Sequence, residues 1–94
     1  MIVEVYTKNK CPNCLSTKSL LNELGIEYEV FDLFEDKFDR VPSEHFEKVS
    51  SLGLMAAPAV FIWDDDHKER LAQWAGHLES RIRAIPSIDE SEVW

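Results

Sequence analysis

The sequence predicts an α/β fold in which a four-stranded mixed sheet is flanked by helices, in the order βαβαββα. Short apolar stretches with strand-like alternation are interleaved with segments of helical spacing, and glycines and prolines stand where elements should end. With 94 residues, 45% of them hydrophobic, the chain should form one domain with a modest core. We expect this domain over residues 1–86, followed by an acidic tail over residues 87–94.

The first three expected elements form a β–α–β unit with a right-handed connection and parallel strands. Residues 2–6 (IVEVY) alternate and are β-branched, as in a buried strand. Residues 11–25 have helical spacing, with Pro12 suited to the first turn and Gly25 to a C-terminal stop. Residues 26–33 (IEYEVFDL) alternate again. The helical stripe consists of Leu15, Leu20, Leu21 and Leu24, and the strand face of Ile26, Tyr28 and Val30.

A charged loop and a second helix follow this unit. Residues 34–42 (FEDKFDRVP) are charged and end in proline, which indicates a loop. Ser43 suits the N-cap of a helix over residues 43–53, and Gly53 suits its end. The apolar residues expected on one face of this helix are Phe46, Val49 and Leu52.

The last part of the chain predicts two strands and a short helix. Residues 58–63 (PAVFIW) indicate a strand opened by a proline, and residues 64–67 (DDDH) a turn. Residues 68–74 (KERLAQW) indicate a weaker strand at the sheet edge. Residues 76–85 indicate a helix that Pro86 stops.

Composition and charge exclude several classes of function. The formal net charge of −8 repels phosphate, and no basic stripe with interleaved aromatic residues is present, so we expect neither nucleic-acid nor membrane-surface binding. Met1 leads directly into IVEVY, without the features of a secretory signal, and the apolar runs are too short to span a membrane. A cytoplasmic monomer is therefore expected. There a lone cysteine pair argues against a structural disulfide.

The two cysteines, Cys11 and Cys14, lie between the first strand and the first helix. Unpaired N–H groups at a helix start stabilise a thiolate, and Lys8 and Lys10 add positive charge nearby. These effects lower the pKa of Cys11 and make it the better nucleophile. Cys14 lies one turn further along and should be more buried. It would attack the mixed disulfide that Cys11 forms and close a disulfide between the two.

Metal binding is an alternative use of the same pair. Tetrahedral zinc needs four ligands, and the remaining candidates are His45, His67 and His77, which do not have the spacing of a zinc finger. A zinc or iron–sulfur site would therefore depend mostly on bridging between two copies of the chain. We expect no cofactor, and a metal-binding or interaction module with the same fold stays as an alternative.

The sequence resembles the glutaredoxins of the thioredoxin fold, specifically the NrdH-redoxin branch. The resemblance runs from residue 3 to about residue 85 through VYTKNKCPNCLSTKSLLNELGIEYEVFDL, DRVPSE, LGLMAAPAV and WAGH. It implies a thioredoxin-like fold and a small electron carrier with Cys11 as nucleophile and Cys14 as resolving thiol. It also implies reduction by thioredoxin reductase and electron transfer to ribonucleotide reductase.

The resemblance implies further site residues. Ala57 and Pro58 stand where the family has its cis-proline loop, whose backbone at residue 57 would pair with a substrate held beside Cys11. WAGH corresponds to a W-S-G-F stretch that contacts the partner protein, although Trp74 also suits the core and Gly76 a tight turn. The site residues that the resemblance implies are Lys8, Pro12 and Asn13 in the active-site loop, Ala57 and Pro58 in the cis-proline loop, and Trp74, Ala75, Gly76 and His77 as the partner contact.

The sequence also departs from related patterns. Glutaredoxins that use glutathione resemble one another in a T-V-P loop and a Gly-Gly-x-x-Asp stretch, where this chain has AAP and AGHLE. A glutathione-dependent dithiol glutaredoxin remains the alternative function, since Lys8 matches a basic position that contacts glutathione. LES stands where NrdH-redoxins have Arg-Pro-Asp. The stretch before DRVP is longer than usual and should add acidic surface around Glu35, Asp36 and Asp39.

Overall fold

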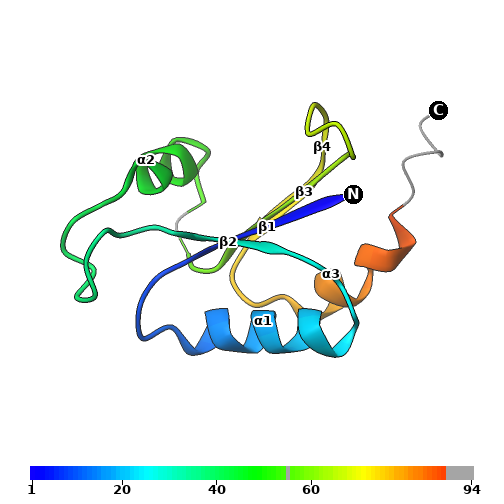
Figure 1. The fold of residues 1–94 in the computed structure, drawn as a ribbon, viewed down its shortest axis with the longest axis horizontal. Coiled ribbons are helices and arrows are strands. Elements are labelled where there is room, and N and C mark those ends of the chain that lie inside the picture. The colour runs from blue at the N-terminus through cyan, green and yellow to red at the C-terminus, as the bar shows by residue number, and fades with distance from the viewer. Residues whose placement is uncertain (55, 89–94) are drawn as a thin grey trace.

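The computed structural model describes residues 1–54 and 56–88, and its element order confirms the predicted βαβαββα arrangement (Figure 1). None of the helices in this part of the chain is long and apolar enough to cross a membrane. Residues 89–94 of the expected acidic tail lie outside the described residues. The elements are β1 (Ile2–Thr7), α1 (Pro12–Glu23), β2 (Glu29–Asp32), α2 (Glu44–Ser51), β3 (Ala59–Trp63), β4 (Arg70–Ala75), α3 (Glu79–Arg83) and a 3-10 turn, η1 (Ile85–Ser87).

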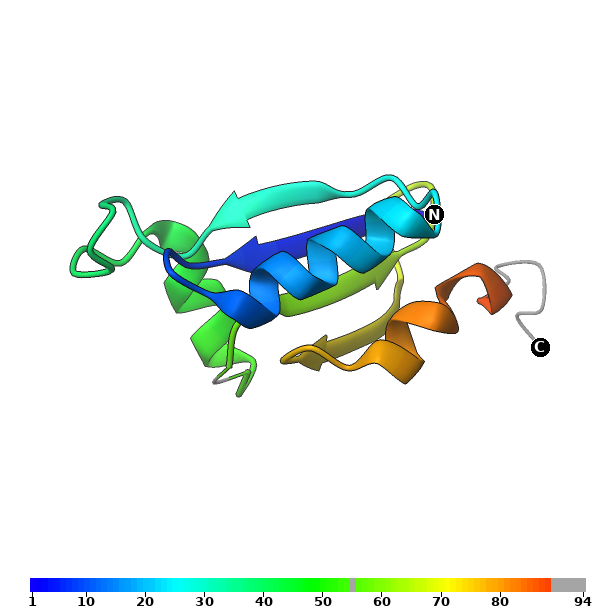
Figure 2. The same cartoon turned by 90° about the horizontal axis from the view of Figure 1, so that it is seen from below.

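The four strands form one mixed sheet in the order β2-β1-β3-β4. β1 and β2 are parallel, whereas β3 pairs antiparallel with both β1 and β4. α1 and α3 cover one face of the sheet and α2 the other (Figures 1 and 2). The sheet therefore has β4 at one edge, as predicted, and β2 at the other.

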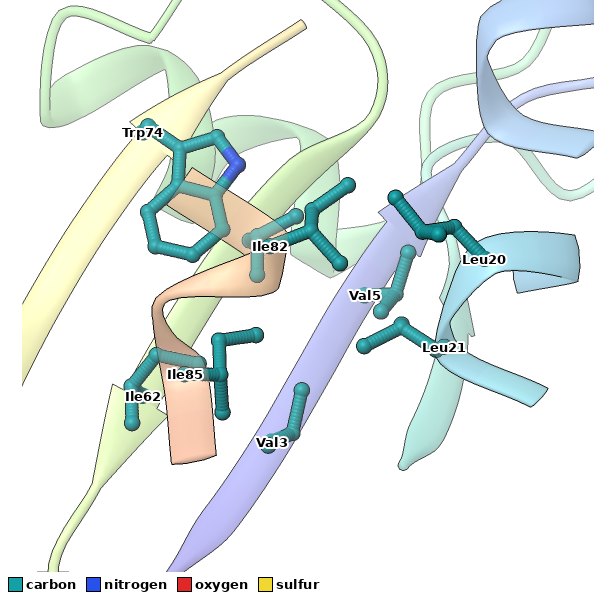
Figure 3. Close-up of a cluster of buried hydrophobic side chains, with 9 residues drawn as sticks. Val3, Val5, Leu20, Leu21, Ile62, Trp74, Ile82 and Ile85 are labelled. Carbon is teal, nitrogen blue, oxygen red and sulfur yellow. The ribbon is translucent and has the colours of Figure 1, made fainter. Parts of the chain in front are cut away.

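Each face of the sheet has its own hydrophobic core. The first core lies between the sheet and helices α1 and α3, and Figure 3 shows side chains from all of these elements meeting there. The second lies under α2. The buried residues of the first core are Val3, Val5, Leu20, Leu21, Val60, Ile62, Trp74, Ile82 and Ile85, and those of the second are Tyr6, Leu33, Val49, Ala59 and Phe61.

Local signals at helix ends act as the sequence predicts. The Ser43 hydroxyl accepts a hydrogen bond of 3.2 Å from the backbone N–H of His45, which caps α2. Gly25 and Gly53 follow α1 and α2 with φ of 71° and 78°, a conformation that glycine adopts without steric cost. These signals are local, so the sequence alone is sufficient to find them.

Two predicted elements are only half as long as expected. β2 covers Glu29–Asp32 instead of residues 26–33, and Val30 is 45% exposed because this edge strand pairs with β1 alone. α3 begins at Glu79 instead of residue 76, since Gly76 has φ of 90° and its N–H donates to the carbonyl of Pro58. Residues 76–78 are therefore a connection that holds the end of β4 near the start of β3.

Two leucines predicted on buried helix faces are exposed. Leu15 on α1 is 65% exposed, and Leu52 after α2 is 37% exposed. Leu15 lies off the buried face of α1, because the buried Cys14, Thr17 and Leu21 follow the i, i+3, i+7 spacing of one face and Leu15 does not. The first core therefore takes its α1 side chains from further along this helix, at Leu20 and Leu21.

Candidate redox site

Cys11 and Cys14 are joined by a disulfide at the start of α1, with their Cα atoms 5.2 Å apart. Cys11 is the N-cap residue, in an extended conformation, and Pro12 is the first residue of the helix. The backbone N–H of Cys14 donates a hydrogen bond of 3.1 Å to Sγ of Cys11. Cys14 is 2% exposed and Cys11 5%, so the second cysteine is the more deeply buried, as expected.

The chain reaches this position through a tight connection from β1. Lys10 has φ of 48°, in the left-handed region, and it turns the backbone directly before Cys11. The first turn of α1 contains no acidic side chain, so none of its own residues neutralises the positive end of the helix dipole. Lys8, Pro12 and Asn13 are exposed around the disulfide. This arrangement favours negative charge on Sγ of Cys11 once the disulfide is reduced.

A second loop is attached to the connection between β1 and α1 through Asn9. The Asn9 side-chain amide donates to the carbonyl of Asp36 and to Oδ1 of Asp39, each at 2.9 Å. Its backbone N–H donates to the same Oδ1 at 3.1 Å. The role of Asn9 was not predicted from the sequence, because its partners lie about thirty residues further along the chain and no local sequence pattern indicates the contact.

Two carboxylates of the loop of residues 34–42 accept hydrogen bonds from other groups of the chain. The Asp36 carboxylate accepts backbone hydrogen bonds from Arg40 and Val41, each at 2.8 Å, and the Asp39 carboxylate binds Asn9. The bond from Val41 is the largest of the effects that lower the pKa of Asp36 below 3.8. Two of the three carboxylates expected to form an acidic surface are thus half-buried and bound to other groups of the chain.

The peptide bond between Ala57 and Pro58 is cis, which confirms the expectation from the family resemblance. The carbonyl of Pro58 accepts a hydrogen bond of 2.7 Å from the N–H of Gly76. Ala57 lines a cleft of about 340 Å³ together with Lys8 and with residues of α2 and its flanking loops. The other lining residues are Leu33, Phe34, Phe46, Val49, Ser50, Leu54 and Ala56.

Residues 74–77 divide between the core and the surface. Trp74 is 4% exposed and packs in the first core, as Figure 3 shows, and within the described residues its indole N–H has no hydrogen-bond partner. Ala75, Gly76 and His77 are half-buried. Nδ1 of His77 forms a hydrogen bond of 2.9 Å with Oγ1 of Thr17, which lies one helical turn after Cys14. The ring of Trp74 therefore offers little surface to a partner, whereas residues 75–77 lie beside α1.

The three histidines lie in separate parts of the structure. His45 contacts the ring of Tyr6, His67 binds the carboxylate of Glu4, and His77 binds Thr17. Across residues 1–54 and 56–88, no group of three histidine, cysteine, aspartate or glutamate residues is placed to hold a metal ion. The one pair of sulfurs is joined in the disulfide.

Comparisons with known proteins agree with this geometry. The family model described as Glutaredoxin matches residues 3–68. The chain is 27% identical over 85 residues to the "Glutaredoxin-like protein NrdH" of Escherichia coli K12, which covers 90% of this chain and 89% of that protein.

Solved structures resemble the chain over similar lengths. The NrdH-redoxin of Escherichia coli, a glutaredoxin-like protein with a thioredoxin-like activity profile, superposes with a TM-score of 0.72 at 27% identity, covering 90% of this chain and 95% of that one. A glutaredoxin from Archaeoglobus fulgidus has a TM-score of 0.65 at 24% identity, covering 89% and 84%, and supports the fold alone. The thioredoxin-like fold is thereby confirmed.

Proposed function

Because the chain belongs to the glutaredoxin family and is a thiol–disulfide oxidoreductase with a C-x-x-C disulfide, we propose that it is a dithiol electron carrier. In this proposal Cys11 is the nucleophile and Cys14 the resolving thiol. The observation that carries it is the N-cap position of Cys11, whose Sγ accepts the N–H of Cys14 while Cys14 itself is more deeply buried.

The proposed reaction consists of two thiol–disulfide exchanges. The Cys11 thiolate attacks one sulfur of a substrate disulfide, so that a mixed disulfide forms and the other substrate sulfur leaves as a thiolate. Cys14 then loses its proton and attacks Sγ of Cys11, which forms the Cys11–Cys14 disulfide and releases the second substrate thiolate. Two electrons pass from the protein dithiol to the substrate, and a separate reductant must return the oxidised protein to its dithiol form.

We infer that thioredoxin reductase is this reductant and that ribonucleotide reductase is the acceptor. The thioredoxin-like activity profile of the Escherichia coli NrdH-redoxin supports a flavoprotein donor. The AAP and AGHLE stretches support it as well, because they lack groups with which related proteins grip glutathione. Ribonucleotide reductase follows from the resemblance of the sequence to NrdH-redoxins. Such a carrier needs a reducing compartment, and we propose the cytoplasm.

Glutathione is the second candidate donor, and one observation favours it. The exposed cation Lys8 lines the same cleft as Ala57 and lies three positions before Cys11 in the chain. A carboxylate of a small peptide thiol would be attracted to Lys8 while its sulfur approaches the disulfide.

A comparison of two reducing systems tests the proposal. The oxidised protein is mixed either with thioredoxin reductase and NADPH or with glutathione, glutathione reductase and NADPH, and NADPH consumption is followed with 2-hydroxyethyl disulfide as acceptor. We expect rapid turnover with thioredoxin reductase and slow turnover with glutathione. The reverse order would replace the proposed donor by glutathione, and turnover with neither system would contradict electron transfer through this disulfide.

A further inference from the structure

We propose that the β1–α1 connection and the loop of residues 34–42, which Asn9 joins, form a recognition surface. This surface would bind protein disulfides that have acidic and apolar surroundings. The inference rests on the proposed dithiol function and names its substrate class. The recognition surface is defined as Lys8, Lys10, Lys37, Phe38 and Arg40, all of which are exposed.

Positive side chains are concentrated on this surface, although the protein as a whole is acidic. The formal net charge of the chain is −8, yet four of its ten lysine and arginine residues belong to the recognition surface. The carboxylates of Asp36 and Asp39 lie in the same loop, but they accept hydrogen bonds from backbone amides and from Asn9. Glu35 is the exposed carboxylate that remains in the loop. Four cationic side chains therefore stand against three carboxylates in this region, and two of the three carboxylates are half-buried, so a small positive excess faces solvent.

Phe38 gives this surface an apolar centre. Its side chain is 61% exposed, with Nζ of Lys37 at 5.3 Å and Cζ of Arg40 at 5.6 Å from the ring centroid. A cation over an aromatic face at these distances is attracted to the ring, and most of the Phe38 side chain is still open to solvent. An acidic segment with an apolar side chain would pair with the cations and pack on the ring.

The surface is held in place before any partner binds. Asp36 fixes the loop from within by accepting the N–H groups of Phe38, Arg40 and Val41. Asn9 then attaches the loop to the connection that leads into Cys11. In Figures 1 and 2 the loop after β2 lies at the same end of the molecule as the start of α1. Because the loop is already ordered, binding of a partner costs little conformational entropy in the loop. The disulfide of a partner bound there would lie near the redox site.

Two matched peptide disulfides test this inference. The peptides have the same length, one internal disulfide and one phenylalanine, and differ only in flanking residues, which are glutamates in one and lysines in the other. The pre-reduced protein is mixed with each peptide in a single turnover, and the rate of peptide reduction is compared with the rate for 2-hydroxyethyl disulfide. We expect faster reduction of the glutamate peptide, with the preference lost in 1 M NaCl, where the screening length is about 3 Å.

Variants assign the preference to the recognition surface. Lys37→Glu and Arg40→Glu should each lower the preference for the glutamate peptide about three-fold, as expected for reversing one exposed charge. Lys68→Glu, which makes the same charge change in the exposed turn before β4, should leave it unchanged. Phe38→Ala should slow both peptides by at least about three-fold and leave 2-hydroxyethyl disulfide unaffected.

Two outcomes would overturn the inference. One is equal reduction of the two peptides by the unmodified protein, and the other is a preference that Lys37→Glu and Lys68→Glu change equally. Failure of the proposed function is distinguishable from both, because the protein would then reduce neither the peptides nor 2-hydroxyethyl disulfide.

Discussion

The backbone N–H of Cys14 donates a hydrogen bond of 3.1 Å to the sulfur of Cys11, at the first turn of α1. This relationship makes the two cysteines unequal although they belong to one disulfide. The donated N–H and the start of the helix favour negative charge on Cys11, whereas Cys14 lies inside the helix and is slightly more buried, at 2% exposed against 5%. Reactivity, access and order of attack should all follow from this difference.

The reduced Cys11 should react with iodoacetamide faster than an ordinary thiol at pH 7. We expect the hydrogen bond and the helix start to lower the pKa of its thiol and so raise its thiolate fraction, although a more stable thiolate is also a weaker nucleophile. With both effects we expect a rate about three-fold above that of glutathione, measured by mass spectrometry on Cys14→Ser. A rate equal to that of glutathione, with the same pH dependence, would contradict a stabilised thiolate.

Asp36→Ala should loosen the loop of residues 34–42. The Asp36 carboxylate accepts the N–H groups of Arg40 and Val41, so its removal leaves both amides open to water. Hydrogen exchange of these two amides should accelerate, whereas the exposed Asp66→Ala should have no effect on them. Unchanged exchange in Asp36→Ala would show that other contacts order the loop.

Acid should weaken the same loop in the unmodified protein. Backbone hydrogen bonds, first of all from Val41, lower the pKa of Asp36 below 3.8, the usual value of an aspartate. A carboxyl group with a lowered pKa stabilises the folded loop above pH 3.8, and this stabilisation disappears as the pH falls through the lowered pKa. Amide chemical shifts of Arg40 and Val41 should therefore titrate below pH 3.8, and in Asp36→Ala they should not.

Glu4→Ala should destabilise the whole domain. Glu4 is 5% exposed on the α2 face of the sheet, where its carboxylate accepts the indole N–H of Trp63 at 2.7 Å and lies 3.1 Å from Nε2 of His67. Truncation leaves the indole donor unpaired beside a cavity, which should cost about 2–3 kcal/mol of unfolding free energy. Urea denaturation followed by tryptophan fluorescence measures this loss.

Glu27→Ala provides the control for Glu4, since Glu27 is exposed and its side chain makes no hydrogen bond or ion pair within the described residues. Its effect should stay within about 0.5 kcal/mol. Equal urea midpoints for the two variants would mean that the hydrogen bonds of the Glu4 carboxylate do not contribute to the unfolding free energy.

The sequence predicts the fold well because most of its signals are local. The alternating residues of β1, the cap at Ser43 and the glycine after α1 each act within a few positions, so they place elements without knowledge of the tertiary structure. The C-x-x-C pair between a strand and a helix identifies the redox site for the same reason. The cis bond before Pro58 was predicted from the family resemblance and not from the residues themselves.

Long-range contacts explain what the sequence could not predict. α3 starts late because the N–H of Gly76 binds the carbonyl of Pro58, eighteen positions earlier. The Asp39 carboxylate binds Asn9, thirty positions earlier, and the buried Glu4 binds Trp63, fifty-nine positions later. A pattern of alternating residues shows that Glu4 faces away from Val3 and Val5, but not that a distant indole satisfies it.

The most direct test of the account is to identify which cysteine captures a substrate. Cys11→Ser and Cys14→Ser are each reduced and mixed with disulfide-bonded insulin or with 2-hydroxyethyl disulfide. The adducts are mapped by mass spectrometry. We predict a lasting mixed disulfide on Cys11 in Cys14→Ser, and neither adduct nor insulin reduction in Cys11→Ser. Adduct formation on Cys14, or measurable turnover by Cys11→Ser, would contradict the assignment of Cys11 as the nucleophile.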